Sequence, residues 1–267
     1  MCIFTRSVRR AGPTRLFARA LEDRRQALVV QVDVERTEGL AVVVPLPVSL
    51  GCRLDDIELV DLSRCTGFFA DVGVAFGDEA PARAVGPDRL GRLDAQLAVG
   101  VDALEALGVP LGEDVRQRLP LGDHTAFAVL RMGQPGRRLL LPPRRRRLPP
   151  LGIVFPRLDP TCLYFPTVIA VDDTIEETTL YEHALYAQLE DGGRPPLDTP
   201  WQRSDAPLGE GVDAARANDL VAPSLPGWRL LLQGEHPNED TWLAPTVFTM
   251  VGTEEEDSGQ WMRRGSV

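Results

Sequence analysis

The sequence predicts an α+β protein, mostly antiparallel sheet with helices packed on it. The first fifty residues contain four short runs rich in Val and Leu, which are typical of strands in a covered sheet. Two later stretches repeat apolar residues at helical spacing, and strand-like runs lie between and after them. Hydrophobic residues make up 43% and charged residues 25% of 267 positions, which is ordinary globular composition.

The N-terminal strands are expected at residues 2–8, 16–21, 27–34 and 40–48, as a β-meander. A turn signal, Ala11-Gly12-Pro13, separates the first two strands. Pro45 and Pro47 predict that the fourth strand ends there or lies at a sheet edge. The chain is thus expected to begin on a strand that Cys2 heads.

The rest of the chain is predicted to mix helices and strands. Apolar spacing predicts helices over residues 90–104 and 178–189. Strands are expected at residues 125–131, 138–141, 152–155, 162–171, 228–233 and 242–251, and six prolines favour a loop between residues 194 and 226. We expect one domain over residues 1–252 and an acidic, disordered tail over residues 253–267.

Charge and composition exclude several function classes. The net charge of −10 argues against nucleic acid as a partner, because phosphate contacts need a basic surface. All 29 basic residues are arginine, which excludes lysine Schiff-base chemistry. No signal-like segment or membrane-length apolar run is present, so we expect a cytoplasmic protein without a membrane, metal or cofactor. The cysteines, expected as free thiols, are Cys2, Cys52, Cys65 and Cys162.

Cys2 has the strongest claim to chemistry. Removal of Met1 would leave a residue that carries both a thiol and a free α-amine, the pairing used by N-terminal nucleophiles. The amine, with a pKa near ~8, suits a general base, and the thiol needs only a nearby cation to ionise. The alternative is that Cys2 is a small buried hydrophobe on the first strand.

A short motif follows Cys2: Leu16-Phe17-Ala18-Arg19, with Glu22 three positions beyond the arginine. This opening resembles that of the choloylglycine hydrolase and penicillin V acylase family of N-terminal-nucleophile amidases. The resemblance covers about 22 of the 267 residues and implies a four-layer αββα sandwich. It implies that Cys2 is nucleophile and base, that Arg19 supports the thiolate and that Glu22 orients the α-amine. Glu22 stands where the family has an aspartate, and Ala20 replaces the usual asparagine.

The family also uses asparagine in its oxyanion hole, and this chain has only Asn218 and Asn238. Asn238 is the better candidate because residues 236–240 read as a turn that could present a donor. These residues together predict an amidohydrolase or acyltransferase acting on a small-molecule amide through a Cys2 thioester. The alternative is a non-catalytic β-rich binding protein, or an inactive hydrolase-like fold, with Cys2 structural. The oligomeric state stays open.

Other candidate residues favour structural roles. The three histidines match no zinc-site spacing: they are His124, His183 and His236. His183 is expected to pack on a helix face, and no local motif supports a triad that joins it to Cys65 or Ser63. Six arginines between residues 137 and 147 could bind phosphate or carboxylate, but such a run is more often a solvated loop.

Overall fold

Strands dominate the structure, a computed structural model that describes residues 2–4, 11–35, 41–79, 94–131, 145–190 and 193–247. Within these residues the α-helices have only seven, six and five residues: α1 (Phe68–Val74), α2 (Val101–Ala106) and α3 (Glu113–Gln117). The predicted α+β fold, a helix-packed αββα sandwich, is therefore wrong. Helices of one or two turns cannot form the two outer layers that such a sandwich requires.

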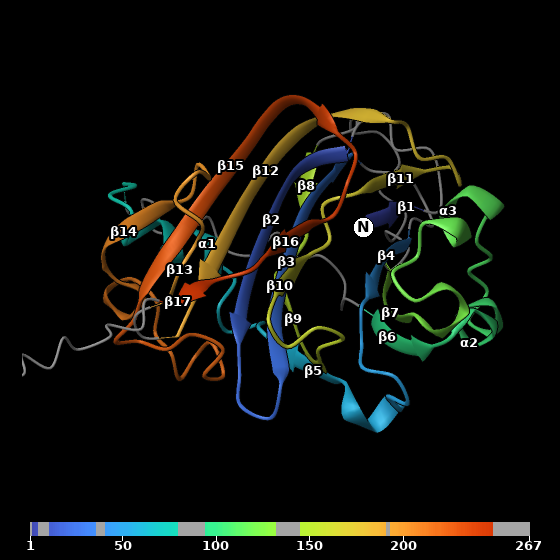
Figure 1. Ribbon diagram of the computed structural model, residues 1–267, viewed down its shortest axis with the longest axis horizontal. Helices are drawn as coiled ribbons and strands as arrows, with labels where there is room; N and C mark the ends of the chain where they lie inside the picture. Colours follow the sequence, from blue (N-terminus) through green and yellow to red (C-terminus); the bar gives the residue numbers. More distant parts are fainter. Residues whose placement is uncertain are drawn as a thin grey trace, which may run out of the picture.

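The larger sheet has eight strands, four of which have ten or more residues: β2, β3, β12 and β15 (Figure 1). Its order is β14-β15-β12-β2-β3-β9-β5, with β8 pairing beside β9 on β3. β12 runs parallel to β2, and the other neighbours are antiparallel. The strands are β2 (Ala11–Ala20), β3 (Arg25–Glu35), β5 (Glu58–Asp61), β8 (Arg145–Arg147), β9 (Leu151–Pro156), β12 (Thr178–Gln188), β14 (Gln202–Pro207) and β15 (Pro226–Pro237).

The smaller sheet has five strands and holds the N-terminus. Its order is β11 (Ile169–Val171), β1 (Cys2–Phe4), β4 (Ala41–Leu46), β7 (Ala126–Arg131) and β6 (Asp94–Val99). β1 lies between β11, to which it is parallel, and β4. Two small pairs remain: β10 (Leu163–Phe165) with β16 (Thr241–Leu243), and β13 (Gly193–Arg194) with β17 (Thr246–Val247). The 3-10 turns are η1 (Leu54–Asp56), η2 (Gly122–His124) and η3 (Leu208–Glu210).

Alternation along the strands creates three hydrophobic clusters. Leu16 and Ala18 of β2 pack in one cluster with Val42 and other residues of the smaller sheet, so the main core lies between the two sheets. Phe17 points to the opposite face, where it packs with Phe68 of α1. A third cluster joins the outer face of the smaller sheet to α2 and α3, and its largest buried residue is Phe127.

Both predicted helices differ from the structure. Residues 90–93 lie outside the described residues, and the rest of the first expected helix is β6 followed by the short α2. The second expected helix, residues 178–189, is strand β12. Leu180, Ala184 and Ala187 fit a helical spacing, but Tyr181, His183 and Leu185 alternate inward and are buried, as in a strand.

The predicted N-terminal strands are confirmed in part, but the predicted β-meander is wrong, because β1 and β4 belong to the smaller sheet and β2 and β3 to the larger one. Residues 2–4, 27–34 and 41–46 are strands, whereas residues 5–8 lie outside the described residues. The expected turn at residues 11–13 is wrong, because Ala11 begins β2. Its register shifts between Ala11 and Thr14, where the Gly12 backbone lies against the Asp33 carbonyl. A side chain at Gly12 would collide there, so the glycine serves close strand approach rather than a turn.

The predicted acidic tail, residues 253–267, and the predicted strand at residues 138–141 fall outside the described residues. Across the part of the chain that the structure describes, no helix is long and apolar enough to cross a membrane.

Candidate functional site

Cys2 lies in the main core, between the two sheets. Its exposed fraction is 2%, and it pairs with Ile169 of the parallel strand β11. The Cys2 backbone N–H donates to the Val168 carbonyl, and the thiol donates to the Pro166 carbonyl at 3.5 Å. The pKa of the thiol is raised to about 11, chiefly by burial; the positive amino terminus lowers it in part, and the Asp240 carboxylate contributes to the rise. At neutral pH the sulfur is therefore a protonated thiol rather than a nucleophilic thiolate.

Asn238 lies close to Cys2, but on the other side of β11. Its Oδ1 accepts hydrogen bonds from the Ile169 N–H (2.8 Å) and the Tyr181 hydroxyl (3.1 Å). Its Nδ2 donates to the carbonyls of Ile169 (2.9 Å) and Glu176 (3.1 Å). Both amide protons are thus used inside the protein, so no donor is left for the oxyanion of a substrate.

Arg19 and Glu22 belong to a different part of the molecule. Arg19 lies two residues from Phe17 and so points to the α1 side of the larger sheet, where its Nη1 donates to the Asp219 carbonyl at 3.1 Å. Glu22 is exposed in the turn between β2 and β3. Figure 1 shows this turn at the bottom of the view and the N-terminus at the upper right. The structure brings Cys2 and Asn238 together, but neither Arg19 nor Glu22 joins them.

The hydrolase interpretation is accordingly wrong. An N-terminal-nucleophile amidase acting on a small-molecule amide needs an accessible thiolate, a supporting cation and a free oxyanion donor. Here the Cys2 thiol is buried and protonated, the Arg19 cation is engaged elsewhere, and the Asn238 amide is saturated. The resemblance of the opening residues to the choloylglycine hydrolase family stays a prediction.

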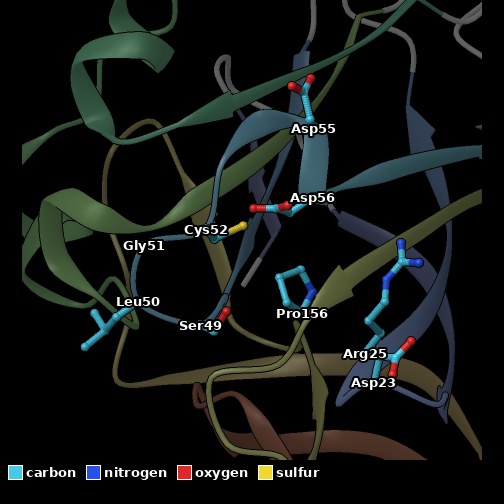
Figure 2. A pocket seen from close by; sticks show the side chains of 9 residues that line it. All are labelled: Asp23, Arg25, Ser49, Leu50, Gly51, Cys52, Asp55, Asp56 and Pro156. Carbon is cyan, nitrogen blue, oxygen red and sulfur yellow. The ribbon is translucent and has the colours of Figure 1, made fainter.

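A cavity of about 420 Å³ lies near the turn between β2 and β3 (Figure 2). Its polar lining includes the carboxylates of Asp23, Asp55 and Asp56 and the half-buried thiol of Cys52. Burial and the Asp56 charge raise the pKa of Cys52, so this thiol is also protonated. Among the described residues, no cluster of three or more His, Cys, Asp or Glu side chains could hold a metal ion.

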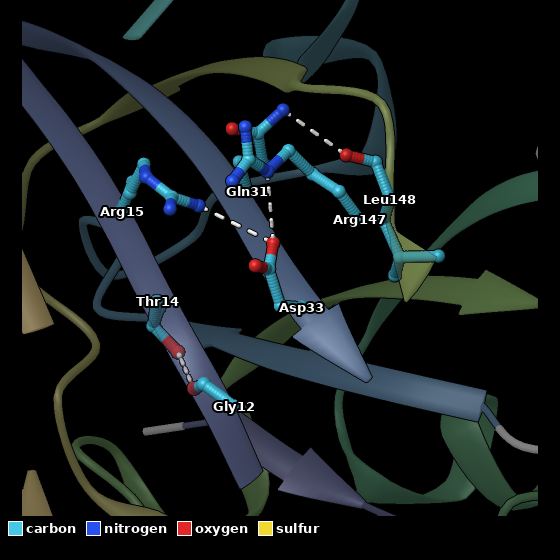
Figure 3. Close-up of polar contacts among 7 residues, drawn as sticks. All are labelled: Gly12, Thr14, Arg15, Gln31, Asp33, Arg147 and Leu148. Carbon is cyan, nitrogen blue, oxygen red and sulfur yellow. Dashed lines mark hydrogen bonds and ion pairs between the residues drawn. The ribbon is translucent and has the colours of Figure 1, made fainter. Parts of the chain in front are cut away.

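Asp33 of β3 forms ion pairs with two arginines on the larger sheet (Figure 3). Its Oδ1 lies 3.2 Å from Arg15 Nη1 and 3.2 Å from Arg147 Nε. Arg147 belongs to the basic run, whose residues 145–147 form β8 rather than the predicted loop, while residues 137–144 lie outside the described residues. This end of the run therefore binds an internal carboxylate.

A ring cluster that the sequence did not predict lies on the inner face of β12 and β15. Tyr181 lies between two histidines, with ring centroids 4.5 Å from His183 and 6.0 Å from His236. His183 is buried, and among the described residues its Nδ1 has no hydrogen-bond partner. The alternation of Tyr181, His183 and Leu185 is the sequence signal for this strand face, but the helical spacing of Leu180, Ala184 and Ala187 favours a helix over the same residues.

No family model and no curated protein matches this chain. Similar solved structures include the crystal structure of baculovirus P35, with 8% identity and a TM-score of 0.45 over 90% of this chain and 97% of that one. The complex of P35 with caspase-8 shares 8% identity at a TM-score of 0.40, covering 87% and 96% of the two chains. These values are too low for the likeness to carry an inference about fold or function.

Proposed function

We propose that this chain is a non-catalytic, β-rich interaction protein in which Cys2 is a structural residue. The observation that carries this proposal is the environment of Cys2. The side chain packs among apolar residues of both sheets, and its thiol is bonded to a main-chain carbonyl and protonated at neutral pH. A cysteine in such surroundings behaves as a small hydrophobe.

An interaction role is supported by the outer face of the larger sheet. Leu180 on β12 and Leu231 on β15 are 62% and 50% exposed. Leu231 lies opposite Ala184 of β12, so both leucines are on the same face of the sheet. Further along the same face of β12, Tyr186 is covered by Phe69 of α1. Apolar side chains on an uncovered stretch of sheet gain free energy when a partner removes them from water.

The labelling test uses N-ethylmaleimide on the native protein at neutral pH. We expect Cys52 to react at least about tenfold faster than Cys2, because a buried thiol reacts only during opening. Mass spectrometry of the labelled peptides measures both rates, with Cys52→Ala and Cys2→Ala as matched controls. Rapid labelling of Cys2, or an acyl adduct on Cys2 after incubation with penicillin V, would falsify the proposal.

A binding measurement separates interaction from thiol chemistry. Caspase-8, the partner in one similar solved structure, is the first protein probe. Any binding should be equal for wild type, Cys2→Ala and Cys2→Ser, because the proposed role of Cys2 is packing alone. Loss of binding in both variants, with folding intact by circular dichroism, would contradict a purely structural Cys2.

A further inference from the structure

We draw no further inference here: the strongest candidate, the exposed apolar stretch around Leu180 of β12 and Leu231 of β15 on the outer face of the larger sheet, carries none, because nothing in the part of the chain that the structure describes shows what covers it.

Discussion

At the scale of single residues, three buried side-chain amides make the backbone hydrogen bonds that a neighbouring strand would otherwise make. Each one bonds to both the N–H and the C=O of a single backbone residue, as a neighbouring strand would. Gln26 binds Tyr164, Gln188 binds Ala222, and Asn238 binds Ile169. Each pair makes two hydrogen bonds, with donor–acceptor distances between 2.7 and 2.9 Å. The backbone groups of Tyr164, Ala222 and Ile169 are thereby bonded to side chains from distant parts of the sequence, which keeps these polar groups satisfied.

Replacing Asn238 with alanine should lower the free energy of unfolding by about 3 kcal/mol. The change removes four hydrogen bonds and leaves the Ile169 N–H and C=O buried without partners, at about 1–3 kcal/mol for each such group. Urea denaturation of wild type and variant measures the difference. Gln233→Ala, at an exposed position on β15, is the control and should change stability by less than about 0.5 kcal/mol. A loss below about 1 kcal/mol for Asn238→Ala would contradict the proposed role.

At the scale of elements, the strands near the N-terminus could be predicted and the long strand β12 could not. Val29 and Val43 sit in Val-rich runs whose strand propensity agrees with the tertiary structure. The second half of β12 is buried on both faces: Leu185 packs in the main core, and Tyr186 packs under α1 on the opposite face. A strand buried on both faces loses its period of two, so its spacing also fits a helix.

The candidate site shows the same limit. The sequence singled out Cys2 and Asn238, which do lie near each other, but no local pattern shows which side of a strand a residue occupies. Arg19 follows Phe17 on the α1 face, and this depends on the register of β2 against β3 and β12. Register is fixed by long-range pairing, so a motif in the first 22 residues could not reveal the separation.

The hairpin between β2 and β3 offers a test at the same scale. Its turn residues Asp23 and Arg24 both have positive φ, 56° and 59°, where glycine is strongly preferred at the second position. Arg24→Gly should therefore stabilise the protein by about 0.5–1 kcal/mol, since the bonds that the Arg157 backbone N–H and Nε donate to the Arg24 carbonyl remain. Thermal denaturation measures the gain. Arg53→Gly, at an extended position with φ of −110°, is the control and should not stabilise; equal gains would contradict the argument.

At the scale of the whole molecule, the two sheets share one core and each carries a further cluster on its outer face. β2 contributes Leu16 to the main core and Phe17 to the α1 cluster, so the two clusters are joined through a single strand. The smaller sheet likewise has Val42 on one face and Val43 on the other. Because every cluster depends on strands that also build the main core, the three should unfold together.

Calorimetry of three matched variants tests this coupling: Leu28→Ala in the main core, Phe68→Ala under α1 and Phe127→Ala beside α2. Each residue is fully buried, so each change should cost about 2–5 kcal/mol and lower one shared Tm by several degrees. The wild type and all variants should show a single transition whose van't Hoff and calorimetric enthalpies agree. If Phe68→Ala instead produced an early separate transition, the α1 cluster would be an independent unit. The single domain expected over residues 1–252 would then have to be divided at β2, the strand that carries Phe17.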